Sequence, residues 1–168
     1  NAQELFTLIK DDYPENEFRH LLSKYIQKKN KEELKSKVIN ELEKLDFEKA
    51  DLIANNSDLL SSKDYLQIKS SHISRYIKSK YNIQINQEQA NALSRINSNL
   101  LVKARAGSGK TRIISLKTAL LIDLYSIKPD EILVMAFNKK AALEISERIK
   151  NELKHKHFEN VRTFHSLA

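Results

Sequence analysis

The stretch Ala104-Arg105-Ala106-Gly107-Ser108-Gly109-Lys110-Thr111 decides how the rest of the sequence is interpreted. It contains both glycines of a 168-residue chain, although an average usage of about 7% would supply roughly twelve. Glycine tolerates positive φ and a close approach of the backbone to a ligand, so the pair marks one loop suited to such an approach. The apolar run Leu100-Leu101-Val102 precedes this loop, and a helical pattern follows it.

This order of strand, glycine-rich loop and helix predicts a phosphate-binding loop, or P-loop. Its backbone N–H groups would converge on a triphosphate, and the positive end of the next helix would face the anion. Lys110 would reach the β and γ phosphates, and Thr111 would offer its hydroxyl to Mg²⁺ as the metal ligand. ATP and Mg²⁺ are therefore the expected cofactors, with Lys110 and Thr111 as the catalytic residues. The alternative is a Gly-Ser turn that caps a helix by chance.

The pattern after the loop predicts an α/β fold with a parallel sheet. Residues 132–137 form a continuous apolar run, typical of a strand that is buried on both sides. Helical patterns lie on either side of this run, and residues 161–164 begin a further short strand. Together with the run at 100–102, the alternation of strands and helices calls for parallel strands joined by right-handed crossovers.

The first 80 residues are predicted to be mostly α-helical. Phe18, Leu21, Leu22, Tyr25 and Ile26 share one helical face, and Pro14 marks a helix start just before them. Breaks are expected at residues 55–57 and 61–62. No catalytic or metal-binding spacing occurs here, so we interpret residues 1–80 as a helical region for packing or for docking a protein partner. Residues 81–168 form the second predicted part.

Composition limits the function classes. The chain has a formal net charge of +7, and residues 81–168 carry nearly all of it, with 14 basic and 8 acidic side chains. A basic surface of this kind attracts polyanions. The chain has no cysteine, which excludes disulfides and cysteine-based zinc sites. It shows neither a signal peptide nor an apolar run of about 20 residues, so we expect a cytoplasmic protein without a membrane partner.

From about residue 83 onward the sequence resembles superfamily 1 helicases of the UvrD/Rep type, and most of all the helicase IV branch. Four blocks occur in the family's order. Residues 85–90 are similar to the Q motif, and residues 100–112 to motif I. Residues 132–149 are similar to motif Ia, and residues 161–168 to motif Ib. The resemblance implies the first part of a RecA-like domain 1A and an ATP-dependent DNA helicase or translocase as the parent protein.

On the nucleotide side, the resemblance implies that Gln89 reads the adenine edge and that Arg112 lies beside the base or the phosphates. A surface glutamine and a solvated arginine are the alternatives for these two positions. Ala104 stands where the usual pattern has glycine, and Arg105 has no assigned role. The expected nucleotide-binding residues are Gln89, Ala104, Arg105, Ala106, Gly107, Ser108, Gly109, Lys110, Thr111 and Arg112.

On the DNA side, motifs Ia and Ib imply contacts to single-stranded DNA or DNA junctions. Phe137 would stack on a base, and Lys139 and Lys140 would neutralise phosphates. A role at the end of a core strand is the alternative for Phe137, and a core role is the alternative for Phe164. The expected DNA-binding residues are Phe137, Asn138, Lys139, Lys140, Thr163, Phe164 and His165.

ATP hydrolysis in this family also requires an Asp-Glu pair at the end of a strand. The pair Asp130–Glu131 precedes a strand instead, so we reject it for this role. We therefore expect an N-terminal fragment that ends at motif Ib and is inactive alone. A nucleotide-regulated nucleic-acid-binding module without unwinding activity is the alternative function. The run His155-Lys156-His157 is interpreted as a solvated helix end.

Overall fold

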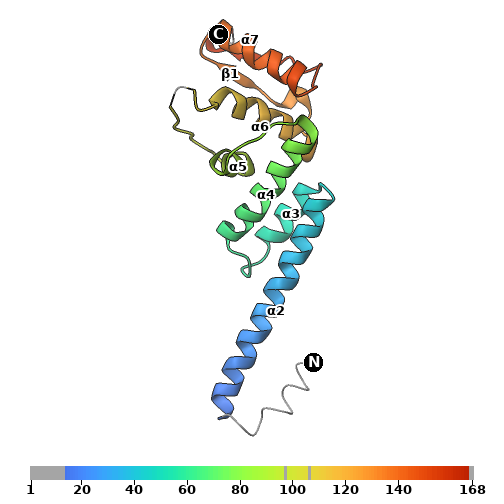
Figure 1. Cartoon of the computed structure of the whole chain (residues 1–168), viewed down its shortest axis with the longest axis vertical. Coiled ribbons are helices and arrows are strands. Elements are labelled where there is room, and N and C mark those ends of the chain that lie inside the picture. The colour runs from blue at the N-terminus through green and yellow to red at the C-terminus, as the bar shows by residue number, and fades with distance from the viewer. Residues whose placement is uncertain (1–13, 97, 106, 167–168) are drawn as a thin grey trace.

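The structure is a computed structural model that describes residues 14–96, 98–105 and 107–166 (Figure 1). It is mostly helical, with one small parallel sheet of two strands. Ala106, one of the expected nucleotide-binding residues, lies outside the described residues. The long helix α2 extends from one end of the molecule, and the strands lie at the other end.

Helix α2 (Glu15–Glu43) begins directly after Pro14, as the sequence predicts. Only its C-terminal part enters the core, through Val38 and Leu42. The preceding turns project away from the other helices (Figure 1). The predicted apolar stripe is therefore largely exposed there, because no described element packs against Leu21, Tyr25 and Ile26.

Helices α3 (Phe47–Asn55) and α4 (Ser62–Tyr81) are separated at the predicted breaks. Asp46 caps α3 by accepting a hydrogen bond from the Lys49 backbone, and Ser61 caps α4 in the same way from Asp64. These caps satisfy N–H groups that have no partner within the helix. Polar residues at the breaks thus set where each helix starts.

One hydrophobic core joins the helices on both sides of residue 80. Phe47 of α3 and Ile73 of α4 pack in the same cluster as Leu93 of α5 (Gln87–Ser94) and Leu116 and Leu120 of α6 (Lys110–Tyr125). The predicted division at residue 80 is therefore not a division of the hydrophobic core. Because the core is shared, the N-terminal helices support the helix that follows the glycine-rich loop.

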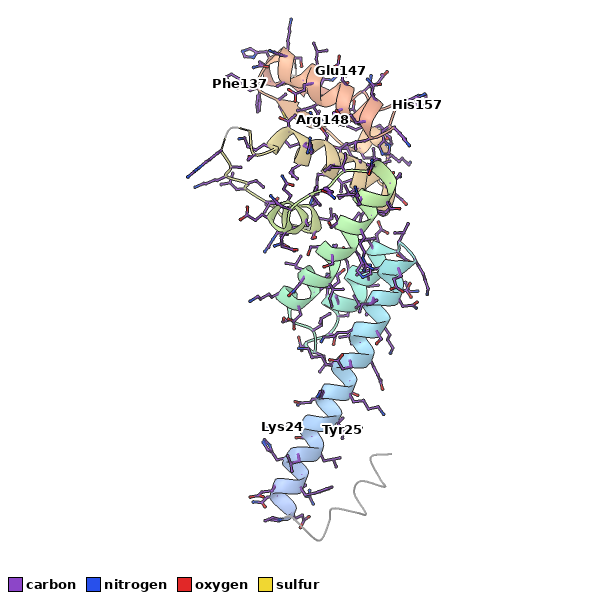
Figure 2. All side chains as sticks on the ribbon, in the orientation of Figure 1. Lys24, Tyr25, Phe137, Glu147, Arg148 and His157 are labelled. Atoms are coloured by element: carbon purple, nitrogen blue, oxygen red, sulfur yellow. The ribbon has the colours of Figure 1, made fainter. Side chains whose placement is uncertain are left out.

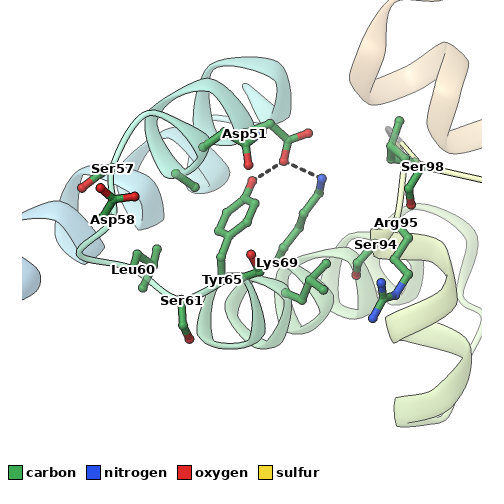
Figure 3. A pocket seen from close by; sticks show the side chains of 15 residues that line it. Asp51, Ser57, Asp58, Leu60, Ser61, Tyr65, Lys69, Ser94, Arg95 and Ser98 are labelled. Carbon is green, nitrogen blue, oxygen red and sulfur yellow. Dashed lines mark hydrogen bonds and ion pairs between the residues drawn. The ribbon is translucent and has the colours of Figure 1, made fainter.

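A buried carboxylate, Asp51, ties α3, α4 and α6 together. It accepts hydrogen bonds from the hydroxyl of Tyr65, from Lys69 Nζ at 2.5 Å and from the Tyr125 hydroxyl at 3.1 Å. Figure 3 shows the first two of these contacts beside a pocket. Burial lowers the pKa of Lys69, while the Asp51 carboxylate opposes this effect. We call these four residues the Asp51 cluster.

A second carboxylate, Asp123 of α6, has a largely covered side chain and holds the C-terminal end of α4. Lys80 Nζ lies 2.7 Å from its Oδ1, and the Tyr81 hydroxyl donates to its Oδ2. His155 Nε2 lies 3.4 Å from Oδ1. The interpretation of His155 as solvated is thus wrong, because its ring is mostly buried against Asp123. We call these four residues the Asp123 cluster.

The sheet consists of β1 (Val134–Ala136) and β2 (Val161–Thr163), which are parallel with Val134 opposite Val161 and Ala136 opposite Thr163. A 3₁₀ turn (Pro129–Glu131) precedes β1. Helix α7 (Lys139–Glu147) continues into a π-helical turn (Arg148–Glu152), and a 3₁₀ turn (Phe164–Ser166) follows β2. Ile145 and Ile149 cover the face of β1 that Val134 and Ala136 form.

Two predictions about strands are wrong. Residues 100–102 form no strand, and Leu101 is 81% exposed, because no described strand lies beside this run to pair with it. The run at 132–137 is buried on one side only, since Leu133 and Met135 are exposed. They face a groove of about 440 Å³ that Leu100 and Val102 line from the other side. The described chain thus shows a mostly helical fold with a small parallel sheet.

Candidate functional site

The glycine-rich loop curls tightly just before α6. Gly107 has a φ of +78° and Gly109 a φ of +86°, which is the left-handed region that favours glycine. Gly109 is the N-cap of α6, and the Ser108 backbone N–H donates to the Arg105 carbonyl at 3.3 Å. The loop therefore delivers the chain directly into the N-terminus of a 16-residue helix.

Lys110 folds back over the loop. Its Nζ donates to the carbonyl oxygens of Ala104 at 2.8 Å and of Arg105 at 2.7 Å. The ammonium group therefore lies beside the first residues of the loop while remaining exposed to solvent. A positive charge and the N-terminus of α6 are thus brought together, and both attract an anion.

Gln89 reaches the same loop from α5, although 19 residues separate it from Ser108. Its Nε2 donates to the Ser108 carbonyl at 3.2 Å, and its Oε1 accepts from the Asn86 backbone N–H at 3.1 Å. The Asn86 side chain in turn accepts from the Gln89 backbone, which completes a capping box. Sequence reasoning missed Asn86, although an N-cap residue three positions before a glutamine is a recognisable signal.

The remaining loop-side candidates are less constrained. Thr111 is half-buried in the first turn of α6, and its hydroxyl forms no hydrogen bond with the part of the chain that the structure describes. The side chains of Arg105 and Arg112 are exposed, and within the described ranges they form no ion pair. The structure therefore brings Gln89, Lys110 and the two glycines together, while both arginines point into solvent.

The candidate DNA-side residues lie at the carboxyl end of the strands. Phe137 follows β1 and is 84% exposed, so it does not end a core strand. Asn138 caps α7 through a hydrogen bond from the Ala141 N–H at 2.8 Å, which gives its side-chain oxygen a structural role. Lys139 and Lys140 are exposed in the first turn of α7.

The second candidate patch follows β2. Phe164 is 59% exposed, so it is not a core residue, and His165 is also exposed. Thr163 differs, because only 8% of it is exposed and it does not reach the surface with the other two. The register aligns Ala136 with Thr163, so Phe137 and Phe164 leave the same edge of the sheet.

The loop and this sheet edge lie on one side of the molecule. Figure 2 shows Phe137 on the left, the side on which the loop lies, and His157 on the opposite side. The geometry can therefore present an anion site and an aromatic, basic surface together.

No helix in the described ranges combines the length and apolar character that a membrane crossing requires. No group of three or more histidine or acidic side chains gathers in the described part of the chain in a way that could hold a metal ion.

Comparison with known proteins gives one consistent result. Residues 85–168 match the UvrD/REP helicase N-terminal domain. The chain is 42% identical over 86 residues to DNA helicase IV of Escherichia coli (strain K12), which covers 50% of this chain and 12% of that protein. It is 39% identical over 88 residues to the ATP-dependent DNA helicase Rep of Buchnera aphidicola, which covers 51% of this chain and 13% of that protein.

A third relative is the ATP-dependent DNA helicase PcrA of Staphylococcus aureus, which is 40% identical over 65 residues, or 39% of this chain and 9% of that protein. The chain thus spans about an eighth of the length of the first relatives, 12% for DNA helicase IV. The matched half contains α5, the glycine-rich loop, α6 and both strands. The chain therefore belongs to the UvrD/REP helicase N-terminal domain family.

Proposed function

We propose that this chain binds ATP at the glycine-rich loop and forms the first part of the motor domain of an ATP-dependent DNA helicase or translocase. The observation that carries the proposal is the meeting of Gln89, Lys110 and two positive-φ glycines at the N-terminus of α6. The names of the relatives, which include helicases described as ATP-dependent, support the same function.

When ATP binds, Lys110 would exchange its two carbonyl acceptors for phosphate oxygens. Its ammonium group now donates to two loop carbonyls at 2.7 and 2.8 Å. Phosphate oxygens carry more negative charge than carbonyl oxygens, so a bound triphosphate would replace these carbonyls as the stronger partner. The loop amides and the N-terminus of α6 would hold the remaining phosphate oxygens.

Thr111 suits a magnesium ion. Mg²⁺ takes oxygen ligands and is commonly bound by one or two protein groups together with substrate phosphates. The Thr111 hydroxyl is such an oxygen, next to Lys110 and uncommitted to other described residues. When bound, the ion would supply positive charge to the phosphates, while the chain fixes the position of the hydroxyl through the first turn of α6.

Gln89 would serve at the adenine side of the site. Both ends of its amide are now engaged, one by Asn86 and one by Ser108. Each end of the amide keeps a second position, one N–H and one lone pair, and these can pair with an adenine edge. Nucleotide binding would therefore add to the contact between α5 and the loop and need not break it.

Single-stranded DNA is the proposed second ligand, at the sheet edge. Phe137 and Phe164 would stack on bases without regard to sequence, and Lys139 and Lys140 would neutralise phosphates. DNA junctions present single strands of the same chemistry. Since this edge and the loop lie on one side, contacts made by ATP and by DNA would share α6 and the sheet as a common support.

The N-terminal helices are proposed to dock a protein partner. The exposed stripe of Leu21, Tyr25 and Ile26 on α2 supports this role, as does the near balance of charge in residues 1–80, with 15 basic and 14 acidic groups. Removal of the projecting half of α2 should leave the salt dependence of duplex DNA binding unchanged. A reduced salt slope would show that this half contacts DNA.

The test of the main proposal uses Lys110→Ala in the full-length protein, with the exposed Lys103→Ala as a matched control. ATP hydrolysis stimulated by single-stranded DNA should fall on the order of 100-fold in the first variant, because a preorganised charge on the phosphates is lost. The control should retain full activity. Unchanged hydrolysis in Lys110→Ala would overturn the proposal, and ATP-dependent DNA binding without unwinding would identify a regulated binding module instead.

A further inference from the structure

Helix α5 is attached at its far end as well as at Gln89. Lys117, two turns into α6, extends its Nζ to the Leu93 carbonyl at 3.4 Å and also donates to the Arg95 carbonyl. Leu93 lies in the last turn of α5, and Arg95 is its C-cap. Lys117 therefore connects the C-terminal end of the short helix α5 to the middle of the loop-bearing helix.

The carbonyls at that end need such a donor. The last carbonyl groups of a helix have no partner within it, and a cation near them interacts favourably with the helix dipole. The last turn of α5 contains no basic residue of its own. Its C-cap Arg95 has a φ of −84°, so the left-handed closure that commonly satisfies these carbonyls is absent. Lys117 supplies from another helix what α5 lacks.

Two other contacts define what Lys117 adds. At the start of α5, the Gln87 side chain donates to Ser70 Oγ of α4 at 3.0 Å. Gln89, two residues further along, donates to Ser108 of the loop. The first contact holds α5 to α4 and the second holds it to the glycine-rich loop. Lys117 holds it to the body of α6, which the core keeps in place.

The surroundings of Lys117 are electrostatically unfavourable for a charged lysine. Burial, together with the charge of Lys69, lowers the pKa of Lys117 to about 8. A side chain needed only for solubility would gain by remaining in water, where its pKa would be near 10.4. The neutral amine still has N–H groups for both carbonyls, so the contact survives on both sides of this pKa.

We propose that Lys117 is a positioning residue that sets the placement of α5 on α6 and thereby holds Gln89 over the phosphate loop. The inference rests on the proposed function, because the placement of Gln89 matters for catalysis only if the loop binds a nucleotide. Within the described residues, the hydrogen bonds of Lys117 go to Leu93 and Arg95 and not to the loop. Its effect should therefore appear in base selection rather than in phosphate binding.

The test compares the affinities of the full-length protein for ATP and GTP, with Mg²⁺ present. Lys117→Met should weaken ATP binding by about tenfold, the upper range for one hydrogen bond, and leave GTP binding nearly unchanged. Lys117→Arg, which retains the charge and the donors, should restore most of the preference for ATP. Lys63→Met, at an exposed lysine of α4, is the matched control and should change neither affinity.

A double variant tests whether Lys117 acts through Gln89. In the background of Gln89→Ala, Lys117→Met should produce no further change in the ratio of the two affinities. If Lys117→Met does not fold, as judged by circular dichroism, Lys117→Gln carries the same comparison. An unchanged ratio in the folded variant, or an equal change with and without Gln89, would overturn the inference. Loss of the proposed function itself would look different, because Lys110→Ala would then leave binding of both nucleotides intact.

Discussion

The two ends of α6 differ sharply in how the protein holds them. At the C-terminal end, Asp123 and Tyr125 belong to the two buried carboxylate clusters, which connect α6 to α3, α4 and the segment after α7. At the N-terminal end, Gly109 and Lys110 adjoin an exposed loop that is held by a few hydrogen bonds from Gln89 and Lys110. One end of the helix is thus fixed in the core, and the other carries the candidate ligand-binding groups. Changes at the two ends should therefore separate stability from ligand binding.

The largest loss of stability is expected at the Asp51 cluster. Asp51→Ala would leave the buried Lys69 without its counter-charge, which costs about 3–5 kcal/mol when one member of a buried pair is removed. Asp58→Ala, at an exposed aspartate nearby, is the matched control and should change stability very little. Urea unfolding followed by circular dichroism measures both. A loss of less than about 1 kcal/mol in Asp51→Ala would mean that the cluster does not hold this end of α6.

A smaller, pH-dependent loss is expected at the Asp123 cluster. Burial acts to raise the pKa of Asp123, but hydrogen bonds from His155, Lys80 and Tyr81 outweigh it and hold this pKa below its usual range. The folded protein therefore binds a proton here less readily than the unfolded chain does, whose aspartates titrate near 3.9. The stabilisation is present above that pH and is lost as the pH falls below it.

Asp123→Asn tests this expectation. At pH 7 the variant should be less stable than the wild type by about 2 kcal/mol, as for hydrogen bonds to a charged group. The difference should shrink as the pH is lowered from about 5 toward 2, because the wild type then protonates. Urea midpoints measured at several pH values check this. A difference that grows on acidification would contradict the stated direction of the pKa.

At the open end of α6, substitution of glycine should affect binding more than stability. Gly109→Ala places a Cβ at positive φ and 3.3 Å from Gln89 Nε2, whereas a Cβ at Gly107 meets nothing within 4 Å. Each variant should lose about 1 kcal/mol of stability from the left-handed backbone. Gly109→Ala should weaken ATP binding more, because it also displaces Gln89. Equal affinities for ATP in the two variants would mean that the position of Gln89 does not affect ATP binding.

The smallest change in stability is expected for Phe137→Ala, at a side chain that is 84% exposed. Stability should stay within about 0.5 kcal/mol of the wild type. Affinity for single-stranded DNA should fall by about 1–3 kcal/mol, the value of one stacked base. Leu143→Ala, at a 63% exposed leucine of α7, is the control without a DNA role. Fluorescence anisotropy with several homopolymers measures the loss, and a loss confined to one sequence would argue against stacking.

The helices were the most predictable part of the fold because their signals are local. Pro14 and the breaks near residues 55–57 and 61–62 mark real helix boundaries. The strand predicted at residues 100–102 does not form, because a strand depends on a neighbour far away in sequence and the described residues provide none. The apolar character of a short run does not show whether a neighbouring strand exists. It also does not show which face of residues 132–137 is buried.

The glycine-rich loop of the candidate site was predictable, because glycine marks positions where the backbone takes a positive φ. Two glycines in a chain of 168 residues identified the loop, and both have positive φ. The roles of Lys117 and Asp123 were not predictable, because they depend on which helices pack together. His155 shows the same limit, since its neighbour Asp123 is 32 positions away along the chain.

The projecting part of α2 fixes how far its first turns lie from the rest of the protein. A helix of 29 residues is about 43 Å long at a rise of 1.5 Å per residue, and only its last turns are buried. Any group that contacts its first turns is therefore held at a fixed distance from the glycine-rich loop. Deleting seven exposed residues would shorten that distance by about 10 Å while turning the attached group by only about 20°. The length of α2 can thus be adjusted almost independently of direction.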